Sequence, residues 1–149
     1  MAETQIDPID ARILDALERD GRLSMRQLAE KVHISRANAY ARVERLTQTD
    51  VITGYTALVD PVRRGLGTSA YLTMNVRQTD WREIHAHLRA LGGVEHIALV
   101  GGEFDVVMLV RARDNADLRR LVLDEIQSIP GILSTRTLLV FEESSPERA

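Results

Sequence analysis

Apolar residues recur at helical spacing in three short stretches within the first fifty residues. The first stretch begins at Asp7-Pro8, which supplies an N-cap residue followed by proline at the first helical position, and it ends at Gly21. Its apolar stripe consists of Ile9, Ile13, Leu14 and Leu17. We therefore expect a helix here that buries one face.

Two further helices are predicted, each with its own capping residue. Ser24 with Gln27 three residues later is typical of a capping box, and Ser35 can cap the next helix. The apolar positions are Leu28, Ala29 and Val32 in one helix, and Ala39, Val43 and Leu46 in the other. Only His33-Ile34 separates the two, which indicates a helix-turn-helix. Residues Val51–Thr56 then favour a short β segment, a small wing beside the three helices.

The pattern changes after a turn-rich segment, residues 60–67 (DPVRRGLG), which we interpret as a linker between residues 1–59 and residues 68–149. The predicted strands beyond it are 69–76, 94–100, 104–112 and 132–141, and the predicted helices are 81–91 and 115–129. The order βαββαβ is typical of a ferredoxin-like domain. The expected fold class is α+β: an N-terminal winged helix-turn-helix plus a C-terminal βαββαβ domain.

Two of the predicted strands are apolar on both faces. The third strand has Phe104, Val106, Met108 and Val110 on one face and Val107 and Leu109 on the other. The last strand has Leu138 and Val140 against Leu133, Leu139 and Phe141. An uncovered apolar sheet face predicts a second copy of the chain packed on it, hence a homodimer. A core closed by the chain's own loops is the alternative.

Charge is distributed unevenly along the chain. The net charge is −3, yet between Arg22 and Thr49 six basic residues stand against two acidic ones. Positive charge there suits phosphate, and the outward donors of the second predicted helix suit base edges in a major groove. The alternative is a small helical domain whose stripes and caps serve packing alone. The acids of this half gather at Asp7, Asp10, Asp15, Glu18 and Asp20.

The composition argues against several other classes of protein. The chain has no cysteine, so it holds no disulfide and no thiolate metal site. We find no nucleophile and base pair, no phosphate-binding Gly-Lys loop and no metal cluster, so we predict no enzyme and no cofactor. His85, His87 and His96 fit solvated surface positions better than metal ligands. No signal peptide or membrane span is indicated, and we expect a cytoplasmic, nucleoid-associated protein.

Five segments together resemble the Lrp/AsnC (feast/famine) family of bacterial and archaeal regulators. The segments are LSMRQLAEKVHIS, RVERL, ITGYTALVDP, LVGGEFDVVMLV and IPGILSTRTLLVFEE, in the family's order and spacing. The resemblance implies a winged helix-turn-helix joined to a ligand-sensing (RAM) domain, dimers built through their sheets, and often an octameric ring of four dimers. It also implies control of transcription in response to an amino acid or related metabolite. The predicted dimer carries two DNA-reading helices, which match the two half-sites of a palindromic, sequence-specific DNA operator. The alternative is a ligand-independent architectural protein that organises the nucleoid.

The resemblance also implies a DNA-reading helix over Ser35–Thr49. The DNA-binding candidates are Ser24, Ser35, Arg36, Ala37, Asn38, Tyr40, Arg42 and Arg45. Ser35, Arg36, Ala37 and Asn38 are expected near base edges, and Arg42 and Arg45 near phosphates. His33 stands where the family usually has glycine, and a left-handed backbone there would cost a histidine about 1 kcal/mol.

An effector pocket between dimers is implied as well. Its candidate residues are Leu99, Gly101, Gly102, Asp105, Leu138, Leu139 and Val140. We favour contact between the Asp105 carboxylate and the ammonium group of a ligand. The alternative is that this carboxylate caps the strand or pairs with an arginine. Glu103 stands at a position that varies in the family, so the identity of the ligand does not carry over.

Overall fold

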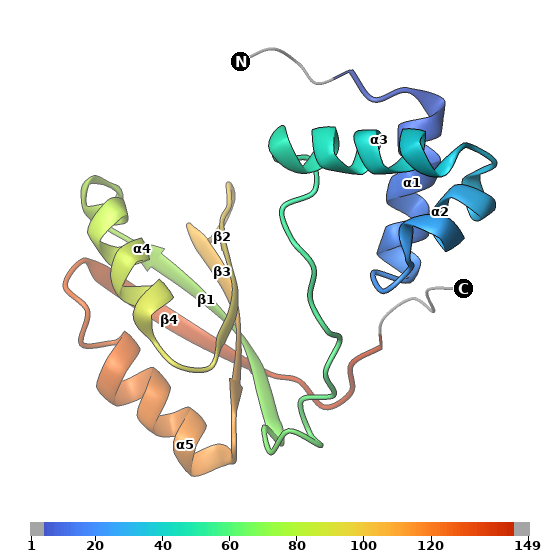
Figure 1. The fold of residues 1–149 in the computed structure, drawn as a ribbon. Coiled ribbons are helices and arrows are strands. Elements are labelled where there is room, and N and C mark those ends of the chain that lie inside the picture. Colours follow the sequence, from blue (N-terminus) through green and yellow to red (C-terminus); the bar gives the residue numbers. More distant parts are fainter. Residues whose placement is uncertain (1–4, 145–149) are drawn as a thin grey trace. The chain divides into compact units, whose positions relative to one another are not determined.

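The computed structural model describes residues 5–144, which divide into two units at the Leu58–Val59 bond (Figure 1). The first unit contains helices α1 (Pro8–Arg19), α2 (Met25–Val32) and α3 (Arg36–Gln48). The predicted linker, residues 60–67, begins the second unit with a hydrogen-bonded turn in which Leu66 N donates to Pro61 O at 2.8 Å. None of the helices in residues 5–144 is long and apolar enough to cross a membrane.

The second unit is a four-stranded antiparallel sheet with helices on one face, as the predicted order required. Its elements are β1 (Thr68–Val76), the 3-10 turn η1 (Gln78–Asp80), α4 (Trp81–Ala90), β2 (Val94–Leu99), β3 (Val106–Ala112), α5 (Asn115–Arg120), the π-helical turn η2 (Leu121–Ile126) and β4 (Ile132–Leu139). The strand order is β2-β3-β1-β4. The expected α+β fold class is confirmed.

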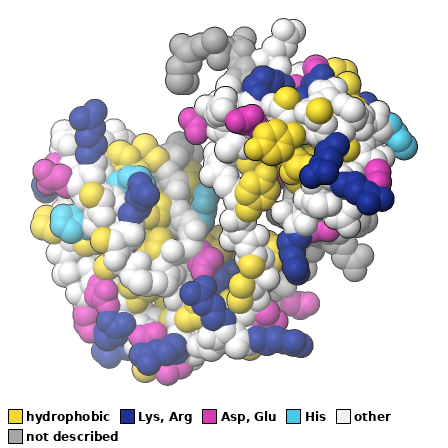
Figure 2. Space-filling model, in the orientation of Figure 1, with side chains coloured by type: hydrophobic (Ala, Val, Ile, Leu, Met, Phe, Trp, Pro, Cys, Tyr) yellow, Lys and Arg dark blue, Asp and Glu magenta, His cyan; other side chains and the backbone are white. Residues whose placement is uncertain are grey.

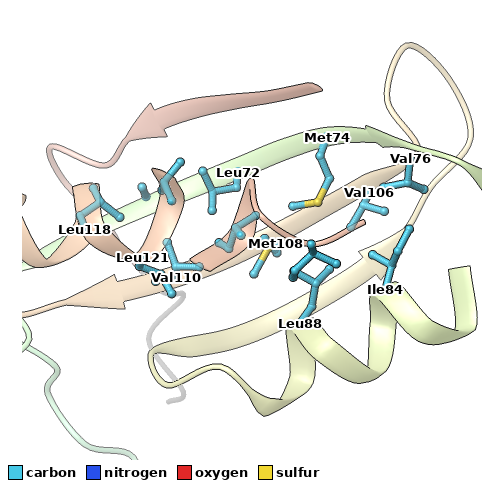
Figure 3. Close-up of a cluster of buried hydrophobic side chains, with 14 of the residues drawn as sticks. Leu72, Met74, Val76, Ile84, Leu88, Val106, Met108, Val110, Leu118 and Leu121 are labelled. Carbon is cyan, nitrogen blue, oxygen red and sulfur yellow. The ribbon is translucent and has the colours of Figure 1, made fainter. Parts of the chain in front are cut away.

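Each unit has its own apolar core. In the first unit the side chains of Ile13, Leu28 and Leu46, one from each helix, are fully buried together. In the second unit the core lies between one face of the sheet and the helices α4 and α5 with η2 (Figure 3). The sheet contributes Ala70, Leu72, Met74, Val76, Val106, Met108 and Val110, and the helices contribute Ile84, Leu88, Leu118, Leu121, Val122 and Ile126.

Within residues 59–144, no helix or strand covers the other face of the sheet, which we call the uncovered sheet face. Strand register places Tyr71 of β1 between Leu109 of β3 and Leu138 of β4, on the face opposite the core. Tyr71 and Leu138 are exposed and Leu109 is half-buried. Thr73, two residues after Tyr71, is only 6% exposed, and its Oγ1 is the one buried side-chain polar atom of residues 5–144 found without a hydrogen-bond partner. The predicted two-sided apolar pattern is therefore present.

Three details of the sequence prediction are wrong. The segment Val51–Thr56 forms no strand. The backbone amides of Val51 and Ile52 both donate to Leu46 O at 2.9 Å, which caps the end of α3, and residues 53–56 have no strand of the same chain beside them. Phe104 lies before β3, so it does not continue the Val106 face, and the predicted helix 115–129 ends as η2.

Candidate DNA-binding surface and effector site

Both helices of the helix-turn-helix begin after the serine that the sequence indicated. Ser24 Oγ accepts a hydrogen bond from Gln27 N at 3.3 Å, and Gln27 Oε1 accepts one from Ser24 N at 2.9 Å, so the capping box is present. Ser35 Oγ accepts from Asn38 N at 3.2 Å. These bonds satisfy amides that the first turn of a helix leaves without partners, and they fix where α2 and α3 begin.

The turn between α2 and α3 keeps a left-handed residue although that residue is histidine. His33 has φ 59° and ψ 50°, and Ile34 N donates to Ala29 O at 3.0 Å across the turn. A side chain with a Cβ is disfavoured in this region by about 1 kcal/mol relative to glycine. Histidine therefore adopts the left-handed conformation at this position at a small local cost.

The first turns of α3 present side chains to solvent. Arg36, Ala37 and Asn38 are exposed, and Tyr40 has an exposed fraction of 61%. No carboxylate of residues 5–144 forms an ion pair with Arg36, whereas Arg26 on α2 is paired with Glu30 at 3.0 Å. Figure 2 shows Lys and Arg side chains beside hydrophobic ones on the face of the helical unit that is in view. The Arg36 guanidinium is therefore available to an anion.

Arg42 and Arg45 are held by two aspartates of the α1 N-terminus. Arg42 Nη1 lies 2.6 Å from Asp7 Oδ2 and 2.8 Å from Asp10 Oδ1, and Arg45 Nη2 lies 2.6 Å from Asp10 Oδ2. The Asp10 side chain is 1% exposed and that of Arg42 is 21% exposed. We expected both arginines to contact phosphate, and the sequence did not predict these ion pairs with Asp7 and Asp10.

The pKa values of both aspartates follow from these contacts. The hydrogen bond from Arg42, followed by backbone amides, lowers the pKa of Asp7. Burial on its own would raise the pKa of Asp10, but hydrogen bonds from Arg45, the Asp7 amide and Arg42 outweigh it and lower the pKa. Both carboxylates are therefore ionised at neutral pH.

The effector candidates form two separate groups in one chain. Leu99, Gly101 and Gly102 lie at and after the end of β2, whereas Leu138–Val140 lie at the end of β4. These strands are opposite edges of the sheet, three strand spacings or roughly 14 Å apart. Leu99 and Leu138 are 56% and 49% exposed. One copy of the chain therefore does not bring all seven residues into one pocket.

Asp105 has partners inside the chain. Its Oδ2 accepts from Val76 N at 2.9 Å, its Oδ1 accepts from Gln78 Nε2 at 3.4 Å, and its own N–H donates to Met74 O at 3.1 Å. The carboxylate thus caps the end of β1, where the pairing of β1 with β4 is irregular between Asn75 and Val76. This is the capping role that the sequence analysis weighed as the alternative to ligand contact.

The glycine turn after β2 has open space around it. Gly102 has φ +136°, and no atom lies within 4 Å of the position that a Cβ would take. Beside it, Glu103 lies 3.7 Å from Arg136 of β4, and the Arg136 guanidinium stands 5.2 Å from the centre of the Phe104 ring. The turn is therefore anchored to β4 through Glu103 and is open to solvent at Gly102.

Sequence reasoning missed Asp7 and Asp10 as partners of the reading helix. It identified Asp7 as an N-cap, and the structure confirms this, since Asp7 Oδ1 accepts from Ile9 N and Asp10 N at 2.8 Å. The available signal was spacing: Asp7 and Asp10 are three residues apart, and so are Arg42 and Arg45. Pairs at this spacing share one helix face, so two such pairs can meet.

Family models cover both units of the chain. The Lrp/AsnC ligand binding domain matches residues 69–149, and a winged helix-turn-helix DNA-binding domain matches residues 6–53. Among curated relatives, the leucine-responsive regulatory protein of Haemophilus influenzae is 35% identical over 93% of this chain and 85% of its own length.

Solved structures agree with the family models. A transcriptional regulator of Neisseria meningitidis in complex with L-Met has a TM-score of 0.88 at 25% identity, covering 95% of this chain and 93% of that one. AsnC of E. coli has a TM-score of 0.84 at 28% identity, covering 93% of this chain and 94% of that one. The family models and the relatives together cover the helix-turn-helix and the sheet domain, and the chain therefore belongs to the Lrp/AsnC family of transcriptional regulators.

Proposed function

We propose that this regulator binds specific DNA sequences through α3 and that its sheet domain adjusts this binding in response to an amino acid or a related metabolite. We assign residues 1–59 to DNA reading and residues 68–149 to effector binding and assembly. The observation that carries the DNA-reading part is the exposed first turn of α3, capped by Ser35, with Arg36 unpaired among residues 5–144 and Asn38 beside it. In helix-turn-helix proteins the N-terminal residues of the second helix contact base edges.

The proposed DNA contacts divide by chemistry. Arg36, Ala37, Asn38 and Tyr40 are placed at base edges, Ser24 and Ser35 at the helix starts beside the backbone, and Arg45, whose side chain is partly exposed, at phosphate. The titration that tests this placement compares Arg36→Ala with Arg26→Ala, an exposed arginine already paired with Glu30. We expect Arg36→Ala to weaken binding to a selected operator at least tenfold and Arg26→Ala much less. Equal affinities for the parent and Arg36→Ala would contradict the placement.

We further propose that two copies of the chain pack through the uncovered sheet face. The face carries Tyr71, Leu109 and Leu138 at its centre, and the buried Thr73 hydroxyl beside them lacks a partner in one chain. A stable interface buries about 1,000 Å² or more. A dimer would place two reading helices on the two halves of a palindromic operator, and dimers assembling further to an octamer fit the separation of the two effector groups. Action on chromosomal DNA implies a cytoplasmic, nucleoid-associated location.

The effector proposal rests on the two groups of candidates that lie at opposite sheet edges. Leu99 and Leu138 offer apolar surface, and the amides of Gly101 and Gly102 can donate to a carboxylate. The Neisseria relative was solved with L-Met, which supports an amino acid as the class of ligand. A thermal-shift screen of the full chain against the amino acids and their keto-acid relatives tests the proposal, because a ligand that binds the folded state raises the melting temperature.

One observation favours the architectural alternative. The Asp105 carboxylate already accepts from Val76 N and Gln78 Nε2, which leaves less of it for a ligand ammonium group. A DNA-binding protein that needs no effector would use Asp105 only to cap β1. A screen in which no amino acid or keto acid shifts the melting temperature or the DNA affinity would favour this alternative over the sensor. Catalysis is no part of either proposal, and the curated relatives are named as transcriptional regulators.

A further inference from the structure

Arg42 lies at the centre of a hydrogen-bond chain that ends on a proposed DNA-reading side chain. Its Nε donates to Asn38 Oδ1 at 3.0 Å, while its Nη1 donates to Asp7 Oδ2 at 2.6 Å and to Asp10 Oδ1 at 2.8 Å. Asn38 is exposed in the first turn of α3 and Arg42 lies one turn later, largely buried. The Nη1 group of the guanidinium thus donates to the two aspartates, and its Nε–H donates to Asn38.

The two carboxylates that hold Arg42 are themselves fixed by the backbone. Asp7 Oδ1 accepts from Ile9 N and Asp10 N, each at 2.8 Å, and Asp10 Oδ2 accepts from Asp7 N at 3.1 Å. Arg45 Nη2 donates a second hydrogen bond to Asp10 Oδ2, at 2.6 Å. The position of Arg42 is therefore set by the first turn of α1 and not by solvent, which allows it to hold another side chain in one orientation.

This contact decides which end of the Asn38 amide is free. With Oδ1 turned to Arg42 Nε, the Nδ2 amino group is directed away from that bond. Rotation of the amide by 180° would replace an acceptor by a donor facing a guanidinium that has only donors. The held amide offers hydrogen-bond donors, and these match the acceptors of the major groove: N7 and O6 of guanine, N7 of adenine and O4 of thymine.

We propose that Arg42 is a positioning residue that, anchored by Asp7 and Asp10, orients the Asn38 amide so that it reads acceptor groups on a base edge. The proposal rests on the DNA contact of α3 proposed above, and it replaces the expected phosphate contact of Arg42. Its consequence is a base preference that depends on a side chain which does not itself touch DNA.

The test is a matched pair of conservative variants, Arg42→Lys and Arg26→Lys, of the full chain. Lysine keeps a charge for Asp7 and Asp10 but has no Nε–H to hold Asn38. Arg26 is bonded to Glu30 on α2 and forms no hydrogen bond to Asn38, Asp7 or Asp10 within residues 5–144, so its replacement is the control. DNA ligands are first selected from a randomised library by the parent chain. Affinities for the selected sequence and for its single-base variants are then measured for the parent, both lysine variants, Asn38→Ala and the double variant Arg42→Lys/Asn38→Ala.

We expect Asn38→Ala to lose a preference of roughly fivefold at one base pair of each half-site. Arg42→Lys loses the same preference at the same base pair, Arg26→Lys keeps it, and the double variant discriminates no worse than Asn38→Ala alone. Melting curves of Arg42→Lys establish that it is folded. If it is not folded, Asp7→Asn, which removes one anchor and leaves Asp10, takes its place with the same expectation.

Other outcomes overturn the proposal in distinguishable ways. An Arg42→Lys variant that keeps the preference which Asn38→Ala loses shows that Arg42 does not orient Asn38. A uniform loss of affinity for all sequences, with a shallower dependence on salt, makes Arg42 a phosphate contact instead. If Asn38→Ala changes no preference while Arg36→Ala still abolishes tight binding, Asn38 does not read DNA and only this inference fails. If neither variant changes binding, the proposed DNA surface is wrong as well.

Discussion

The buried carboxylate of Asp10 gives the most direct test of how the helix-turn-helix is held together. Asp10→Asn keeps the size of the side chain but removes the charge that faces Arg42 and Arg45 at 2.8 and 2.6 Å. Removing one partner of a fully buried ion pair costs about 3–5 kcal/mol. Arg42 and Arg45 remain 21% and 40% exposed, so solvent compensates part of the loss and we expect about 2–3 kcal/mol.

That loss corresponds to a large fall in melting temperature because the helical unit is small. For a domain of this size, 1 kcal/mol changes the melting temperature by about 4–8 °C, so the helical unit should melt roughly 10–20 °C lower. Far-UV circular dichroism follows both units. The fluorescence of Trp81, the only tryptophan, follows the sheet unit alone and should show an unchanged transition.

The matched control is Asp15→Asn on the same helix. Asp15 is exposed and forms no ion pair within residues 5–144, so the variant makes the same change in net charge without unpairing an arginine. A melting temperature of Asp10→Asn within about 2 °C of the Asp15→Asn value would refute the reasoning, because it would mean that the buried carboxylate contributes no more than a surface charge.

Four further outcomes are expected. The pKa values of Asp7 and Asp10 are lowered, so the stability that they contribute is complete above the ordinary aspartate pKa and is lost as the pH falls through their lower native values; acid titration by circular dichroism should show the helical unit weakening below about pH 4. Tyr71→Asp, in the middle of the uncovered sheet face, should convert the proposed dimer to a monomer by light scattering, and an unchanged dimer mass would place the interface elsewhere. Gly93→Ala should destabilise the sheet unit by more than 1 kcal/mol in Trp81 fluorescence melts, since Gly93 has φ +84° and an added Cβ would lie 2.3 Å from Arg111 O. Asp105→Asn should weaken binding of an amino-acid effector by calorimetry while its amide oxygen can still cap Val76, and a variant that binds the effector as tightly as the parent would limit Asp105 to its capping role.

Local signals in the sequence predicted the helices of the first unit well. Asp7-Pro8, the Ser24 and Gln27 box, and Ser35 each act within four residues, so the pattern and the observed helix starts agree. The βαββαβ order could likewise be predicted, because each element buries one face and so shows its own apolar spacing in the sequence. The conformation of the segment Val51–Thr56 could not be predicted in this way, because a strand exists only with a partner strand, and composition does not provide that partner.

The candidate site was harder to predict from the sequence, because its contacts join residues that are far apart in the chain. The bonds from Arg42 to Asp7 and Asp10 join residues 35 and 32 positions apart, which no local pattern encodes. The strand order β2-β3-β1-β4 separates Leu99 from Leu138, whereas the sequence presents them simply as candidates for one pocket. Asp105 was identified as important, but its partner Val76 N lies on the neighbouring strand β1, so its capping role became visible only in three dimensions.

The placement of the two groups of effector candidates on opposite edge strands has a consequence for any measurement of ligand affinity. If the proposed pocket needs both edges, it is complete only where copies of the chain meet, and ligand binding and subunit association are then thermodynamically linked. Ligand then promotes assembly, and dilution of the protein weakens the apparent affinity for ligand. A regulator built in this way responds to the product of two concentrations, that of the metabolite and its own, and a dissociation constant has meaning only beside the protein concentration at which it was measured.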